Sequence, residues 1–279
     1  MNEVLEPFLN AEIGRCIYCP REITSWDQPL GKEHVIPKGM GGVWTLLKAS
    51  CKKHEDVTKR FEGIVMHEGG LKDLREVMGF PSRRSKERTG TREVTFMVGS
   101  ERRTETVPLD QHPGGWILPV YALPTKLTGE TPAEDVRVLH RIGKRREEAI
   151  QKLQQRFGIT ALVMSVVDPR AWAQMMAKIG YCFAVGCVGL DTFEEVYVLP
   201  TILEGKLLGH YVGCLEGAPM NTGNQGNLVT MSQAQRELTV YIRLFAQMEF
   251  PEYTVVVGRL RDTTYKIRAR SLVEDTEEA

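Results

Sequence analysis

The stretch CIYCPREITSWDQPLGKEHVIPKGMGGVWTLLKASCKKH, residues 16–54, decides the fold of the N-terminal part of the chain. It begins with a Cys-x2-Cys pair and ends with a Cys-x2-His pair, with a longer interval between them than in a simple zinc ribbon. Each short spacing lets two side chains on a tight turn or a helix start converge on one ion, and two such pairs suit tetrahedral zinc. The sequence therefore predicts one structural zinc ion. Its predicted ligands are Cys16, Cys19, Cys51 and His54.

A second motif lies inside this interval. Residues 33–42, EHVIPKGMGG, place an acidic residue and a histidine before two apolar residues, a proline and a later glycine pair. Together with the flanking pairs and the downstream run ASCKKHEDVTKRFEG, residues 49–63, this arrangement resembles HNH endonucleases of the type whose fold is held by a zinc knuckle pair. The resemblance covers residues 14–63 and implies a ββα-metal module.

The resemblance also implies a chemistry. Hydrolysis of a phosphodiester needs an activated water and positive charge beside the phosphate, and a neutral histidine is a suitable general base. By resemblance, His34 is that base, Glu33 binds the catalytic metal, and Glu55, directly after the last zinc ligand, completes the metal site. The implied metal is Mg²⁺ or Mn²⁺, which prefer oxygen ligands. Because consecutive side chains on a strand point to opposite faces, we expect an irregular strand at Glu33 and His34.

Three positions depart from the pattern of that family. Glu55 stands where Asn or His is usual, and His54 stands where Cys is more usual. The middle Asn of the family has no counterpart in the matching residues 44–47, WTLL, so a catalytically impaired relative stays an alternative. His54 has two interpretations, as the fourth zinc ligand or as a ligand of the catalytic metal. The first is favoured because Cys51 alone could not close a tetrahedral site.

The charge of the chain points to a local contact with nucleic acid rather than a global one. Lys and Arg number 36, and so do Asp and Glu, so the net charge is zero. Residues 83–103 carry seven basic side chains against three acidic ones, which predicts either a phosphate-contacting arm or an ordinary solvated hairpin. The partner that we expect is nucleic acid, with DNA favoured. The predicted contact residues are Lys38, Lys52, Lys59, Arg60, Arg83 and Arg84.

The whole chain is predicted to be an α+β protein in three parts. Residues 1–80 form the zinc module, residues 81–112 a basic hairpin and linker, and residues 113–279 an α+β domain that serves recognition or homo-oligomerisation. Within these parts we expect strands at 92–98 and 102–109, a helix at 143–158, a strand at 159–167, and a helix that starts at Asp168-Pro169. The other three cysteines are expected to be structural thiols.

The sequence has no apolar run of 18 residues and an acidic N-terminus, so we expect a cytoplasmic protein with no membrane contact. The function expected first is a metal-dependent endonuclease. A non-catalytic zinc-containing protein that binds nucleic acid is one alternative, and a zinc-stabilised interaction scaffold is another.

Overall fold

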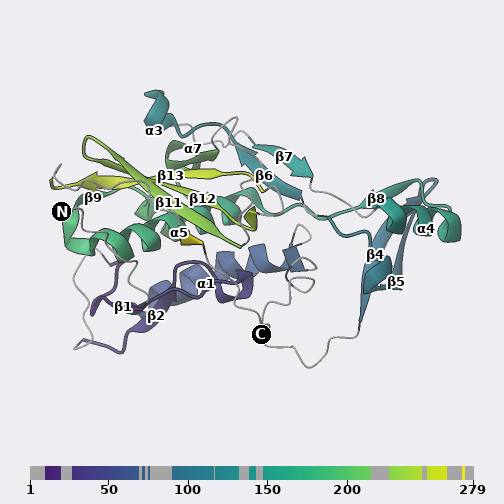
Figure 1. Ribbon diagram of the computed structural model, residues 1–279, viewed down its shortest axis with the longest axis horizontal. Coiled ribbons are helices and arrows are strands. Elements are labelled where there is room, and N and C mark those ends of the chain that lie inside the picture. The colour runs from purple at the N-terminus through teal and green to yellow at the C-terminus, as the bar shows by residue number, and fades with distance from the viewer. Residues whose placement is uncertain are drawn as a thin grey trace.

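A computed structural model gives the fold (Figure 1). The described residues are 10–19, 27–68, 71–72, 75, 90–115, 117–131, 138–142, 147–214, 226–246, 250–262 and 272–273. Helices and strands are mixed along the chain, as expected for an α+β protein. Arg83 and Arg84, two predicted contact residues, lie outside the described residues.

The N-terminal part is a small sheet followed by a helix. Strand β2 (Gly31–His34) runs antiparallel to β3 (Thr45–Ser50), and β1 (Ala11–Glu12) runs parallel to the other edge of β3. Helix α1 (Lys52–His67) follows β3 directly. The register of β2 against β3 shifts between Gly31 and Glu33, so the strand is irregular just before the expected place, whereas Glu33 and His34 pair in regular register with Leu46 and Thr45.

The loop between β2 and β3 depends on a glycine pair. It contains the short 3-10 turn Lys38–Met40, after which Gly41 adopts a φ of 85°. A Cβ atom on Gly42 would lie 1.9 Å from the carbonyl oxygen of Ile36, a distance that no side chain tolerates. The backbone therefore closes on itself at Gly42, and this closure holds the end of β2 in place.

We expect Gly42→Ala to lower the free energy of unfolding by about 2 kcal/mol or more, because the backbone must move to admit the methyl group. Gly63→Ala is the matched control. A Cβ atom on Gly63, inside α1, meets nothing within 4 Å. That variant should be more stable than the native chain by about 0.5–1 kcal/mol. Denaturant unfolding measures both, and equal stabilities for the two variants would contradict this account of the loop.

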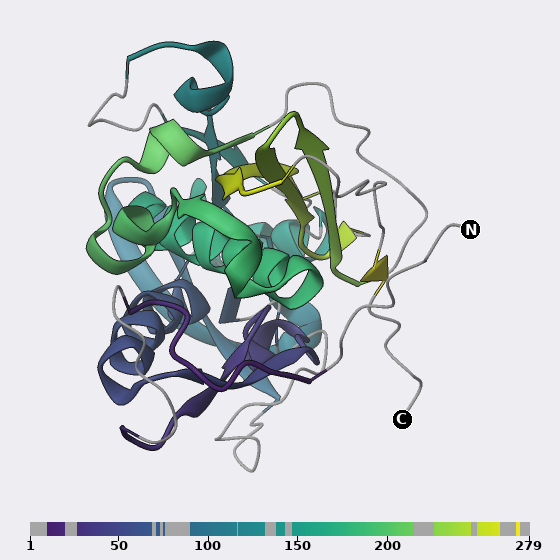
Figure 2. The ribbon, with the colours of Figure 1, turned by 90° about the vertical axis from the view of Figure 1, so that its left-hand side faces the viewer.

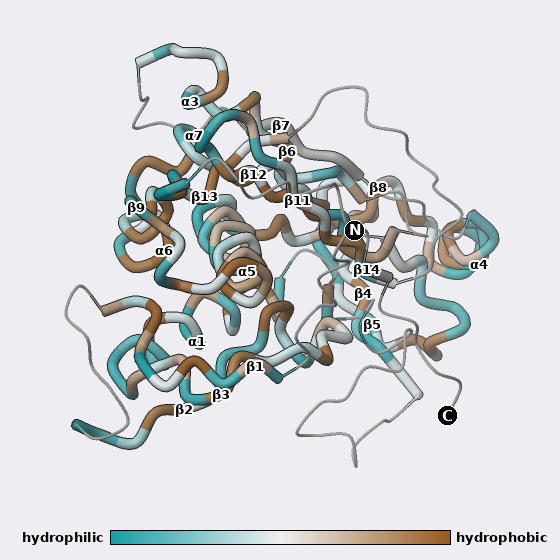
Figure 3. The backbone as a smooth tube through the Cα atoms, turned by 60° about the vertical axis from the view of Figure 1, so that its left-hand side comes forward, coloured by the Kyte–Doolittle hydropathy of each residue, from teal (hydrophilic) through white to brown (hydrophobic). Residues whose placement is uncertain are grey.

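Helix α5 (Pro169–Val188) is the centre of the fold. Asp168 caps it by accepting a hydrogen bond from the backbone N–H of Ala171, and Pro169 occupies its first turn, so the predicted start is confirmed. The helix packs between α1 on one side and the C-terminal sheet on the other (Figures 2 and 3). Apolar residues surround it, so most of its side chains are buried.

The C-terminal sheet is antiparallel. Its strand order is β10-β13-β12-β11-β14, and β9 also pairs with β13. Two short helices follow β9, so the chain leaves the sheet after Val196. The elements are β9 (Phe193–Val196), α6 (Leu199–Glu204), α7 (Leu208–Tyr211), β10 (Val212–Cys214), β11 (Leu228–Ala234), β12 (Glu237–Arg243), β13 (Tyr253–Leu260) and β14 (Leu272–Val273).

The predicted hairpin is present and belongs to a separate lobe. Strands β4 and β5 pair along their whole length, β8 adds to β4, and α4 packs nearby with a small apolar cluster of its own. The lobe therefore joins chain from both sides of residue 113, the start of the predicted third part. The elements of the lobe are β4 (Thr91–Val98), β5 (Glu101–Pro108), α4 (Glu147–Phe157) and β8 (Ala161–Val163).

The remaining elements lie in the sequence between β5 and α4, except for one 3-10 turn between α5 and β9. They are the 3-10 turn Leu109–Gln111, the antiparallel pair β6 (Ile117–Tyr121) and β7 (Val138–Ile142), α3 (Thr125–Thr128), and the 3-10 turn Leu190–Thr192.

The main hydrophobic core is continuous from the zinc module to the C-terminal sheet. Buried side chains between residues 16 and 71 and between residues 118 and 260 form one cluster around α5. The N-terminal module is therefore not packed as an independent unit. Among the described residues, no helix has the length and apolar character needed to span a bilayer.

Candidate metal centre and its surroundings

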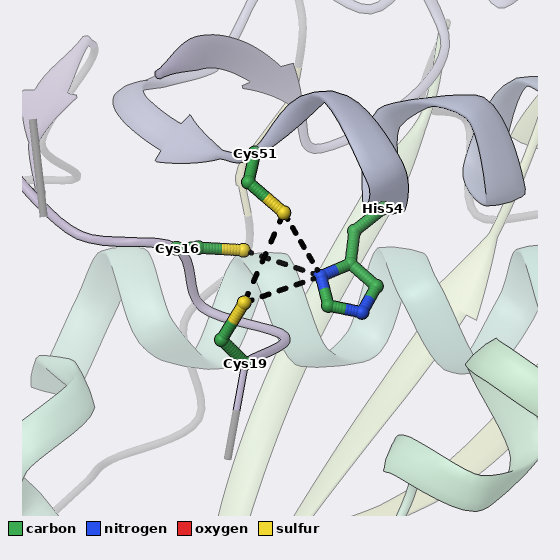
Figure 4. A group of neighbouring side chains, drawn as sticks. All are labelled: Cys16, Cys19, Cys51 and His54. Carbon is green, nitrogen blue, oxygen red and sulfur yellow. Dashed lines mark hydrogen bonds between the residues drawn. The ribbon is translucent and has the colours of Figure 1, made fainter. Parts of the chain in front are cut away.

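The four predicted zinc ligands come together at the start of α1. Cys16 and Cys19 lie on the loop after β1, Cys51 precedes the first turn of α1, and His54 lies within that turn (Figure 4). The Nδ1 atom of His54 is 3.5 Å from the Sγ atoms of Cys16 and Cys19 and 3.3 Å from that of Cys51. The Sγ atoms of Cys19 and Cys51 are 3.8 Å apart.

These distances fit one tetrahedral ion. Zinc with Zn–S bonds of about 2.3 Å and Zn–N bonds of about 2.0–2.1 Å places its ligand atoms about 3.6–3.8 Å apart. All four ligand atoms lie within 4.8 Å of one another. The cluster could therefore hold an ion such as zinc, with His54 as the fourth ligand.

The pKa shifts of Cys16, Cys19 and His54 agree with such a site. Burial raises the pKa of the Cys16 thiol, and burial raises that of Cys19 to about 12, so the thiolate forms need a cation beside them. Burial lowers the pKa of His54, with a smaller effect from Lys53, which keeps the imidazole neutral with a lone pair for a metal.

A second buried cluster lies beside the metal centre and centres on Lys178 of α5. The Nζ atom of Lys178 is 2.8 Å from Oε1 of Glu33 and 3.0 Å from Oε1 of Glu62 on α1. The side chains of Lys178, Glu33 and Glu62 are 0%, 7% and 19% exposed. Lys178 also donates a hydrogen bond to the carbonyl oxygen of His34 and lies 3.5 Å from that of Val35.

Lys178 and Glu33 shift each other's pKa. Burial by itself lowers the pKa of Lys178, but the carboxylates of Glu33 and Glu62 outweigh it and the net shift is upward. Burial raises the pKa of Glu33, and Lys178 opposes that shift. The Glu62 oxygen is close to the ammonium without accepting a hydrogen bond, so its contact is one of charge. Lys178 is therefore a protonated ammonium held between acidic side chains.

The structure does not bring Glu33, His34 and Glu55 to one point. Glu33 faces Lys178, whereas Glu55 accepts a hydrogen bond from Lys59 and lies 3.9 Å from Lys52. Across the described ranges, the zinc cluster is the only group of three or more Cys, His, Asp or Glu side chains close enough to share an ion. The residues that the resemblance assigns to Mg²⁺ or Mn²⁺ therefore do not fit one ion in this arrangement.

His34 is half-buried at the end of β2. Its pKa is lowered to about 4, first by burial and then by the charges of Lys178, Lys32 and Lys38. The imidazole is therefore neutral at neutral pH and has a lone pair that can accept a proton.

The predicted phosphate contacts on the zinc module are exposed. They are Lys38, Lys52, Lys59 and Arg60. Two of them already have acidic partners within α1, because Lys52 pairs with Asp56 at 2.7 Å and Lys59 pairs with Glu55. Pairs of this kind on a helix surface are weak and leave the lysines able to exchange partners.

A cavity of about 760 Å³ lies between the end of α1 and the hairpin lobe. Its charged and ionisable lining residues are mostly basic. They are His67, Lys72, Glu93, Arg92, Arg102 and His112. Arg92 and Arg102 belong to the basic stretch predicted to contact phosphate, whereas His67, Lys72 and His112 were not expected there.

The role of Lys178 was not predicted from the sequence, although one feature of the sequence indicates it. It is the only charged residue between Arg170 and Asp191, within a helix that is otherwise apolar. A charge at such a place is buried and needs partners.

Comparison of the chain with protein-family models, curated proteins and solved structures finds no match.

Proposed function

We propose that the protein acts on nucleic acid as an endonuclease, through an HNH-type module in which His34 is the general base. The observation that supports this most is the order β2, glycine loop, β3 and α1, with the Cys3His cluster at the start of α1. This is the ββα order that the resemblance implies, and it has His34 at the end of β2.

The chemistry assigned to His34 is removal of a proton from the attacking water. A neutral imidazole is needed for this step, and the surroundings of His34 keep it neutral, although a pKa lowered to about 4 also makes it a weaker base than an ordinary histidine. The same lysines that lower its pKa, Lys32 and Lys38, are exposed and would draw a phosphate toward it.

The test is nicking of supercoiled plasmid, with and without Mg²⁺ or Mn²⁺. We expect His34→Ala to slow cleavage by about 10²–10⁴-fold, because removal of a general base costs about that much. Zinc content and affinity for the plasmid should not change. His210→Ala is the control, since His210 contacts Thr125 in a different part of the fold. If His34→Ala nicks as fast as the native chain in a preparation free of other nucleases, His34 is not the base.

The basic cavity provides a surface for the phosphate backbone. We expect Lys72→Ala and Arg102→Ala together to flatten the log–log salt dependence of DNA binding by about two units, one for each lost phosphate contact. Lys206→Ala serves as the control, because Lys206 is exposed and pairs with Glu204 away from the cavity. Filter binding or fluorescence anisotropy at several salt concentrations measures the slope. An unchanged slope in the double variant would show that the cavity does not hold DNA.

A non-catalytic protein that binds nucleic acid is the second candidate. It is favoured by the pairing of Glu33 with Lys178, which occupies the carboxylate that the resemblance assigns to a metal. This candidate predicts salt-dependent binding of DNA without nicking under any metal condition. An interaction scaffold predicts neither binding nor nicking, so the two assays together separate the three functions.

A further inference from the structure

The surroundings of the Lys178 ammonium resemble those of a metal ion more than those of an ordinary ion pair. Two carboxylates, from Glu33 and Glu62, and two backbone carbonyls, from His34 and Val35, lie around one nitrogen. Carboxylates and carbonyls are the donors that hard cations such as Mg²⁺, Mn²⁺ and Ca²⁺ take from proteins. The acidic and carbonyl oxygens come from β2, the loop after it, and α1, whereas the cation comes from α5.

We infer that Lys178 is a built-in cation that occupies a divalent-ion site between Glu33 and Glu62, and that it excludes Mg²⁺ and Mn²⁺ from Glu33 in the native chain. The identification of the displaced ion rests on the proposed HNH-type module, which in the native chain then acts without a divalent ion at Glu33. Binding at Glu33 is measured without reference to cleavage. The contact distances of 2.8 and 3.0 Å are those of an ammonium, longer than the about 2.0–2.1 Å that Mg²⁺ requires.

The charge balance explains why removal of the ammonium would open the site. Two carboxyl groups face one ammonium in a buried place, so the acidic groups outnumber the cation by one. A divalent ion in place of the ammonium would neutralise both carboxylates. Without Lys178, the same two carboxyl groups lack this cation, and a divalent ion that displaces any proton they hold can take its place.

The position of α5 makes this exclusion permanent rather than a switch. Its side chains are buried against α1 on one side and against β12 and β13 on the other. Gly180 approaches β13 so closely that a Cβ atom there would lie 3.0 Å from Val255. Withdrawal of Lys178 would require the central helix of the core to move.

The experiment measures binding of Mn²⁺ to the zinc-loaded full-length chain by titration calorimetry and by the electron spin resonance signal of free Mn²⁺. The native chain and Glu33→Gln should give the same isotherm. Lys178→Met should gain one Mn²⁺ site at least about tenfold tighter than any in the native chain. That site should disappear again in the double variant Lys178→Met, Glu33→Gln. Lys126→Met, a change at a lysine above Tyr197, should behave as the native chain does.

Two outcomes would overturn the inference. One is a Mn²⁺ site in the native chain that Glu33→Gln removes, because it would show that Lys178 does not exclude the ion. The other is a folded, zinc-containing Lys178→Met chain that gains no Mn²⁺ site. If Lys178→Met does not fold, the comparison of the native chain with Glu33→Gln decides alone. The Glu33→Gln variant is expected to fold, because Lys178 keeps Glu62 as a partner in it. A chain that shows the expected binding but does not nick DNA would refute the proposed nuclease function alone.

Discussion

Removal of the metal from the Cys3His cluster is expected to unfold the whole described core, not the N-terminal module alone. Structural zinc contributes about 10–16 kcal/mol in small zinc modules, which is as large as the entire free energy of unfolding of a typical domain. The cluster anchors the loop after β1 to the start of α1, and both belong to the continuous core around α5. Circular dichroism during titration with a strong chelator should show one loss of helix and strand signal together.

Cys51→Ser is the substitution that tests the same point without a chelator. It removes one of the three thiols near His54 and should abolish stoichiometric zinc in elemental analysis. Cys187→Ser is the control, because Cys187 lies in α5 outside the cluster and should leave the zinc content unchanged. A folded Cys51→Ser chain without zinc and with native thermal stability would contradict a structural role for the metal.

The second large effect is expected at Lys178. Lys178→Met should lower the free energy of unfolding at neutral pH by about 3–5 kcal/mol, because it leaves Glu33 and Glu62 buried without their cation. Denaturant unfolding monitored by fluorescence of the buried Trp172 measures the change, in buffer without divalent ions.

A triple variant separates the cost of the uncompensated charge from the cost of lost packing. Lys178→Met with Glu33→Gln and Glu62→Gln removes all three charges at nearly constant volume, and it should regain most of the lost stability. Lys206→Met breaks an exposed pair with Glu204, with side chains 70% and 55% exposed, and should change stability by about 1 kcal/mol or less. If Lys178→Met were no more harmful than Lys206→Met, the buried cluster would not be held by its charges.

Much of the local structure could be predicted because short stretches of sequence determine it. The spacing of Cys16, Cys19, Cys51 and His54 was sufficient to predict that the four side chains come together, because one pair lies on a short loop and the other at the start of α1. Asp168 and Pro169 marked the start of α5 through capping. The alternation of residues 92–98 and 102–109 marked the hairpin.

The environment of Glu33 could not be predicted in the same way. Strand alternation places it on the opposite face from His34, but the sequence near Glu33 does not say what covers that face. The answer is Lys178, which comes 145 residues later from a helix whose packing depends on the whole core. The predicted boundary near residue 113 rests on a shift in composition. Such a shift reflects local chemistry and carries no information about long-range contacts such as that between Glu33 and Lys178.

The path of α5 through the core has an evolutionary consequence. The N-terminal module and the C-terminal sheet share one interior. A gene rearrangement that carried residues 10–68 to another protein would carry all four zinc ligands with them. It would leave behind the ammonium that neutralises Glu33 and Glu62, and it would expose the apolar face on which α5 rests. We therefore expect the two halves of this chain to be inherited as a pair, with changes at Glu33, Glu62 and Lys178 occurring together.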